Sequence, residues 1–310
     1  MKQLIFSCML FCVLQTATAQ HQLTKIDSLF TDSQVEKFMY ALDSNFKIKT
    51  IQEGGNYRFD SSICKRIADS LQINKAFYKS DIDNNGFTDL LVIGETYTFK
   101  IFVVFNYGND SVMMKTLTNR MVQDCTFPVI VNNSVIRYYY LNTDYTTPKP
   151  TFNLVYKDLV YKFGDFVELN NHPSNDSIEK IEYEVSGCLG SCPSFSLVIK
   201  KNRLSFLDAD YYNFKDWQRE TGEMKGRYRT IVDDSTFETI NNLLNYIDFS
   251  TLEERYYVDW TDDQIGSVKI TYNNGKEKSI MDYGLIGTYG LARFHQLIFD
   301  LRFNQQWKKQ

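Results

Sequence analysis

The chain has 310 residues and a formal net charge of −4. A mildly acidic chain without a basic cluster argues against nucleic acid and against anionic membrane surfaces as partners. The length favours two domains, and the 21 Tyr, 23 Phe and only 5 Pro favour strands over long helices.

Residues 1–19 have the pattern of a cleavable secretory signal peptide. A short positive start precedes the apolar run Leu4–Leu14, which is too short to cross a bilayer, and Ala17-Thr18-Ala19 is typical of a signal-peptidase site. We therefore expect cleavage after Ala19 and a secreted or periplasmic protein without a transmembrane segment. Removal of the leader takes away Lys2, its one charged residue, so the net charge changes from −4 to −5.

Residues 20–169 are expected to form an α+β domain. Ser33 stands three residues before Glu36, which is the spacing of a helix capping box, and a second apolar helical stripe covers Ser61–Leu71. Short strand-like runs separated by turn residues follow, and they predict an antiparallel sheet covered by these two helices. The runs are Phe87–Ile93, Phe99–Phe105, Val112–Leu117, Val135–Leu141 and Phe152–Tyr156.

The segment 81–89, with the sequence DIDNNGFTD, has the spacing of a calcium-binding loop. Oxygen-bearing side chains at its first, third, fifth and ninth positions, with Gly86 at the sixth, are how a loop wraps a hard cation. The loop resembles the calcium loops of FG-GAP repeats, but the same residues also suit a polar turn without an ion. The expected calcium ligands are Asp81, Asp83, Asn85, Phe87 through its carbonyl, and Asp89.

The polar segment 170–177 is the predicted linker to a second domain, residues 178–310. Alternating apolar residues predict four strands, then a helix that begins with a Ser235–Glu238 capping box, then two strands joined at Asn273–Gly275, and a last helix. This order predicts α+β again, with an antiparallel sheet and its helices on one face in each of the two domains.

Cys188 and Cys192 are four residues apart, and Gly190 between them allows a tight ring. In an exported protein this spacing favours a disulfide, although free thiols, another pairing, or a redox or metal-binding pair stay open. Cys64 and Cys125 are the other cysteines of the mature chain, and four cysteines allow three pairings.

The run Cys188–Phe195, CLGSCPSF, resembles the opening motif of the family called domain of unknown function 6438. Tyr256-Tyr257-Val258-Asp259 and a final helix that ends near Trp307 fit the layout of that family. The resemblance covers about residues 178–308, and the family has no established activity that it implies for this chain.

The sequence has no recognisable catalytic motif. Of the three histidines only His295 lies in a predicted core element, and we expect it to have a surface or helix-capping role. The acidic and aromatic loop around Trp260 is the one place for an enzyme or ligand site, because glycan hydrolysis needs only two carboxylates. Its candidate residues are Asp259, Trp260, Asp262 and Asp263.

The sequence therefore favours a non-catalytic exported module that interacts with an unknown ligand or envelope component and is stabilised by calcium and a disulfide. The alternative is a hydrolase of glycans or peptides that uses the carboxylates of the segment 259–263.

Overall fold

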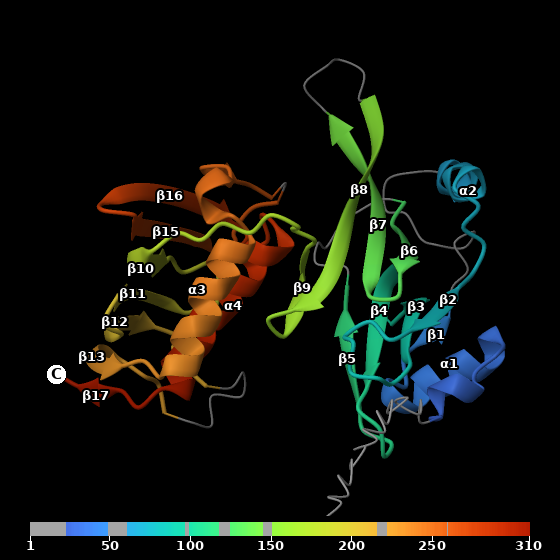
Figure 1. Ribbon diagram of the computed structural model, residues 1–310, viewed down its shortest axis with the longest axis horizontal. Coiled ribbons are helices and arrows are strands. Elements are labelled where there is room, and N and C mark those ends of the chain that lie inside the picture. The colour runs from blue at the N-terminus through green and yellow to red at the C-terminus, as the bar shows by residue number, and fades with distance from the viewer. Residues whose placement is uncertain are drawn as a thin grey trace, which may run out of the picture.

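The computed structural model describes residues 23–48, 61–96, 99–117, 125–144, 151–215, 222–258 and 260–310. The predicted leader and Asp259 lie outside the described residues. The described helices and antiparallel sheets form an α+β protein, as predicted (Figure 1). In the part of the chain described, no helix has the length and apolar character needed to cross a membrane.

The described residues of the N-terminal half form two antiparallel sheets and two α-helices. Its elements are η1 (Ile26–Ser28), α1 (Asp32–Leu42), β1 (Lys47–Ile48), α2 (Ser61–Ser70), β2 (Phe77–Ser80), β3 (Asp89–Glu95), β4 (Phe99–Asn106), β5 (Val112–Thr116), β6 (Phe127–Asn132), β7 (Val135–Asp144), β8 (Thr151–Lys162) and β9 (Asp165–Glu168). The first sheet has the order β1-β3-β4-β5, with β2 also paired to β3, and the second has the order β6-β7-β8-β9.

The central strands β3 and β4 are buried on both faces. Val92 and Val104 pack on one face in a cluster with Phe38 of α1. Leu91 and Val103 pack on the other face, in a cluster that also contains residues of α2 and of the second sheet. Two packed layers therefore enclose the first sheet, which the sequence predicted to be covered only by helices.

In the C-terminal half the described residues form one eight-stranded sheet. Its elements are β10 (Ile178–Val185), β11 (Ser194–Lys200), β12 (Leu204–Tyr211), β13 (Gly226–Ile231), α3 (Asp234–Tyr246), η2 (Phe249–Thr251), β14 (Arg255–Tyr256), β15 (Ile265–Tyr272), β16 (Lys276–Tyr283), α4 (Tyr289–Asn304) and β17 (Lys308–Lys309). The strand order is β14-β16-β15-β10-β11-β12-β13-β17, and only the β14–β16 pair is parallel. The helices α3 and α4 lie side by side across one face of this sheet (Figure 1), where their apolar residues join a single core.

Two helices begin two residues earlier than the expected capping boxes. In α1 the N-cap is Thr31, whose side chain accepts a hydrogen bond from the backbone N–H of Gln34, and not Ser33. In α3 the N-cap is Asp233, which accepts from the N–H of Thr236, and not Ser235. Both predicted boxes were wrong because a second capping residue stands just before each of them.

The segment 170–177 contacts helix α3 of the C-terminal half. The side-chain amide of Asn170 donates to the carbonyl of Tyr246 at 2.6 Å, and the N–H of Ser174 donates to the carbonyl of Asn245 at 3.0 Å. These bonds hold the segment against the end of α3, and the domain boundary within it stays a prediction.

One carboxylate of the N-terminal half caps a helix of the C-terminal half. Glu168, the last residue of β9, accepts hydrogen bonds from the N–H groups of Tyr289 and Gly290, both at 2.9 Å. Lys157 of β8 pairs with the same carboxylate at 3.0 Å. Tyr289 also reaches into the N-terminal core, where its hydroxyl donates to the carbonyl of Leu117 at 2.8 Å. The start of α4 is therefore fixed to the N-terminal half.

Candidate functional site

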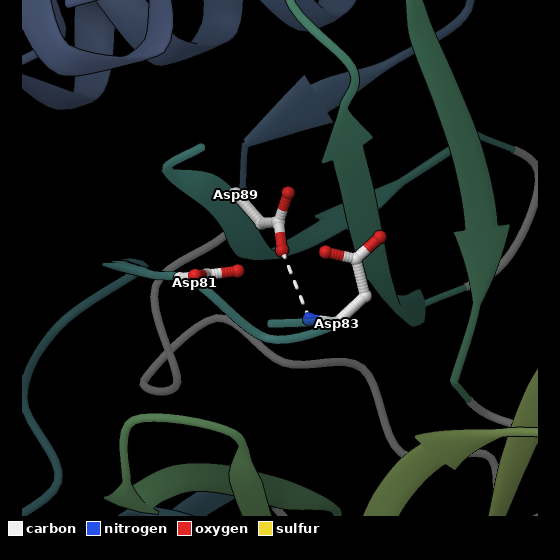
Figure 2. A group of neighbouring side chains, drawn as sticks. All are labelled: Asp81, Asp83 and Asp89. Carbon is white, nitrogen blue, oxygen red and sulfur yellow. Dashed lines mark hydrogen bonds between the residues drawn. The ribbon is translucent and has the colours of Figure 1, made fainter. Parts of the chain in front are cut away.

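Three aspartates of the segment 81–89 lie close together between β2 and β3. One carboxylate oxygen from each of Asp81, Asp83 and Asp89 lies within 4.8 Å of the others. Figure 2 shows the three side chains converging from the loop and from the first residue of β3. The loop therefore gathers the carboxylates that the spacing predicted, and such a set is what a hard cation prefers.

The loop is held in shape by hydrogen bonds from its own backbone. The carboxylate of Asp81 accepts from the N–H groups of Asn85 and Gly86, both at 2.9 Å. Asn84 and Gly86 have φ values of 59° and 88°, which are in the left-handed region and close the turn. These local bonds bring the loop back over its first residue.

Asp89 is the buried member of the set, with none of its surface exposed. Its Oδ2 accepts from the N–H of Ile82 at 2.8 Å, and its Oδ1 accepts from the N–H of Asn106 on β4 at 2.9 Å. Burial raises the pKa of Asp89 to about 7, and burial also raises the pKa of Asp83, which the nearby charge of Asp81 raises further. Within the described ranges no Lys or Arg pairs with these carboxylates, so the charge of the set is uncompensated by side chains there.

Two further predicted ligands lie on the same turn. The side-chain amide of Asn85 donates to Asp83 at 3.2 Å and to the carbonyl of Asn106 at 2.8 Å, and its Oδ1 accepts from the N–H of Phe87. Asn85 therefore ties the loop to the end of β4. The residues present fit a cation with oxygen ligands, while the identity of the ion and its full ligand set stay a prediction.

The acidic and aromatic loop before β15 does not form a carboxylate cleft among the described residues. Both oxygens of Asp263 are engaged, since the indole N–H of Trp260 donates to Oδ2 at 2.9 Å and the N–H of Gln264 donates to Oδ1 at 2.7 Å. Asp262 is exposed. The aromatic ring thus orients Asp263 locally, and the described geometry leaves no pair of free carboxylates facing one another there.

The four cysteines of the expected mature chain form two disulfides, Cys188–Cys192 and Cys64–Cys125. The second joins α2 to the segment just before β6. The first closes the loop between β10 and β11. This loop lies beside the acidic and aromatic loop, because Gln264, which directly follows the latter, donates to the carbonyls of Ser186 and Pro193. Two motifs that are about seventy residues apart in the sequence thus meet at one end of the eight-stranded sheet.

His295 is buried in the C-terminal core, so the expectation of a surface or capping role was wrong. It is only 3% exposed, its Nδ1 lies 2.9 Å from the hydroxyl of Tyr183, and its Nε2 lies 3.1 Å from Oδ2 of Asp282. Asp282 Oδ2 also accepts from the N–H of Gly287 at 2.9 Å, while Oδ1 is buried and has no hydrogen-bond partner in the described part of the chain.

This Tyr–His–Asp arrangement has the contacts of a nucleophile, a base and an orienting acid. All three side chains are buried, however, with Tyr183 only 2% exposed, and burial raises the pKa of that hydroxyl further above its ordinary value. The arrangement therefore joins β10, β16 and α4 as an internal polar bridge. The apolar positions beside His295, Phe294 and Ile298, were the one sequence signal that pointed to its burial.

The sheet face opposite α3 and α4 carries an open hollow of 520 Å³, whose lining surface is more apolar than polar. Its lining includes Glu184, Ser196, Ser267, Glu254 and Arg255. Glu184 stands directly between the two serines in the strand register. Short side chains beside longer charged ones produce the hollow, which the sequence analysis did not anticipate.

The fold and these sites define an antiparallel α+β protein with an acidic loop and a hollowed sheet face that no helix of the described residues covers. Residues 179–302, from β10 to near the end of α4, match the sequence model of the family described as Domain of unknown function (DUF6438). This match confirms the resemblance of the C-terminal half. No curated protein and no solved structure matches the chain.

Proposed function

We propose that this protein is an exported, non-catalytic interaction or ligand-binding module whose N-terminal half is stabilised by calcium. The observation that carries the calcium part is the convergence of Asp81, Asp83 and the buried Asp89. Gathering three carboxylates at one turn is unfavourable unless a cation balances them, and extracellular calcium modules bind at about 10⁻⁴–10⁻³ M.

A small ligand would meet the module at the hollow on the free sheet face. Carboxylate, hydroxyl and guanidinium groups stand there beside apolar side chains and without a helix over them, which supports recognition of a molecule with both polar and apolar groups. Catalysis at the segment 259–263 has less support, because both oxygens of Asp263 already accept local hydrogen bonds. A glycan array with wild type and with Ser267→Trp, which fills the hollow, tests this part. Binding that survives the substitution excludes the hollow.

Thermal unfolding with and without calcium tests the metal part. Millimolar calcium should raise the Tm of the mature protein by about 3 °C, since a ligand that binds only the folded state stabilises it by mass action. Asp83→Asn should abolish this rise. Asp69→Asn removes the same charge from the exposed surface of α2 and should leave the rise intact.

Magnesium at the same concentration separates a calcium site from a general effect of divalent cations. Equal responses to the two ions, or no response of wild type to calcium, would contradict the calcium proposal. Export is tested separately, by expressing the full chain in a bacterial host and sequencing the N-terminus of the exported product. A mature protein that begins at Gln20 is expected.

A further inference from the structure

The two disulfides differ sharply in their access to solvent. Cys64 and Cys125 are 2% and 3% exposed and belong to the core between the two N-terminal sheets. Cys188 and Cys192 are only half-buried, and Leu189 between them is 82% exposed. A thiol in solution therefore reaches the second pair in the folded protein, whereas it reaches the first pair only after the core opens.

The ends of the Cys188–Cys192 loop are held without the disulfide. The side-chain amide of Gln264 donates to the carbonyls of Ser186 at 3.0 Å and Pro193 at 2.7 Å, which lie on the two sides of the loop. Gln264 is itself buried, so these bonds are shielded from water.

Two neighbouring segments, the start of β15 and the residues after β12, add to this support. The N–H of Ser186 donates to the carbonyl of Ile265 at 3.0 Å, and the side-chain amide of Asn213 donates to the carbonyl of Ser194 at 2.9 Å. Beyond the loop, the strand pairing starts at once with Val185 opposite Phe195. Opening the disulfide thus releases only residues 187–192 and leaves the sheet in place.

We propose that Cys188–Cys192 is a thiol–disulfide exchange site whose substrate is a dithiol, and that Cys64–Cys125 is the permanent disulfide of the protein. Exchange needs an accessible sulfur and a fold that tolerates both redox states, and the loop meets both conditions. Its two cysteines also stay close when reduced, because their strands remain paired, so the ring closes again readily.

The exchange proceeds through a mixed disulfide. A thiolate of the incoming dithiol attacks one sulfur of the Cys188–Cys192 bond, a new S–S bond forms, and the other cysteine leaves as a thiolate. The second thiol of the reagent then attacks the mixed disulfide. The protein gains two electrons and two protons as two thiols, and the dithiol becomes its cyclic or intramolecular disulfide.

Graded reduction of the mature protein tests the proposal, with dithiothreitol as the probe. After each exposure the free thiols are alkylated, and the four cysteines are quantified by peptide mass spectrometry while circular dichroism follows the fold. Cys188 and Cys192 should be alkylated at least tenfold faster than Cys64 and Cys125, with the circular dichroism unchanged. Oxidised dithiothreitol should then restore the bond in the folded protein.

Equal rates for the two pairs, or reduction of Cys188–Cys192 only as the protein unfolds, would overturn the proposal. The double substitution Cys188→Ser, Cys192→Ser provides a second measurement, and it should fold with a native spectrum. The Gln264→Ala variant checks the reason given for this tolerance. Reduction should lower the Tm of this variant by more than it lowers the Tm of wild type. An identical decrease in Tm would contradict the claim that Gln264 holds the ends of the reduced loop.

Discussion

The N-terminal half buries both faces of its central strands, whereas the C-terminal half leaves one face of its sheet to solvent. Leu90 to Gly94 on β3 are buried without interruption, while buried and open residues alternate along β10. The first arrangement depends on contacts between layers that are far apart in the chain. The second depends on two helices and a polar bridge around His295.

The largest expected effect follows from the disulfide that joins the N-terminal layers. Cys64 and Cys125 are 61 residues apart, so the substitutions Cys64→Ser and Cys125→Ser together should cost about 4 kcal/mol of unfolding free energy. Cys188 and Cys192 are 4 apart, and their double substitution should cost about 2 kcal/mol. Urea denaturation of the two double variants measures both. Equal losses of unfolding free energy would contradict the expectation that the disulfide closing the longer loop stabilises the protein more.

The polar bridge of the C-terminal half should be nearly as important. His295→Phe removes the partner of Tyr183 and leaves the buried carboxylate of Asp282 with only the N–H of Gly287, so we expect a loss of about 3 kcal/mol. His172→Phe is the matched control, because His172 is exposed, and it should change stability by less than about 0.5 kcal/mol. Similar unfolding midpoints for the two variants would contradict an internal bridge.

The contact between the halves predicts a smaller effect that depends on pH. Burial alone would raise the pKa of Glu168, but Lys157 and the N–H groups at the start of α4 outweigh it, so the pKa lies below its ordinary value. Stabilisation by this carboxylate is therefore complete above the unfolded pKa of 4.5 and is lost as the pH falls through the lower folded value.

Glu168→Gln should accordingly cost about 1–2 kcal/mol at pH 7 and progressively less in acid. Unfolding curves between about pH 7 and pH 3 measure the difference from wild type. Glu238→Gln, on the exposed side of α3, removes the same charge and should change stability by less than about 0.5 kcal/mol. If Glu168→Gln lowered the unfolding free energy by the same amount at every pH in this range, the negative charge of Glu168 would not contribute to the contact between the halves.

The sequence predicted the strands of the C-terminal half well. In a sheet with one solvent-exposed face, each strand has apolar residues at alternate positions. Ile181, Tyr183 and Val185 alternate with glutamates, and all of this strand is present as β10. In the N-terminal half the continuous run Leu90–Ile93 located a strand, but it carried no information on what covers each face. The short strands β1, β2, β6 and β9 were not predicted, and without β6 and β9 the second sheet was not recognised.

The same contrast applies to the candidate sites. The aspartate loop is local, so spacing alone predicted which carboxylates meet. The bridge between Tyr183, Asp282 and His295 joins residues that are 112 and 13 positions apart, and only the packing of α4 on the sheet brings them together. The hydrogen bonds from Gln264 to the two ends of the disulfide loop could not be predicted from the sequence, for the same reason.

The smallest expected effect tests where helix α1, which covers one face of the first sheet, begins. Thr31→Ala removes the side-chain oxygen that accepts from the N–H of Gln34, and it should cost about 1 kcal/mol. Ser33→Ala changes an exposed residue within the first turn and should be neutral or slightly stabilising, because alanine is the better helix former. Chemical denaturation of both variants, followed by circular dichroism, gives the comparison. A larger loss for Ser33→Ala would restore the capping box expected from the sequence, and would require α1 to begin two residues later than Asp32.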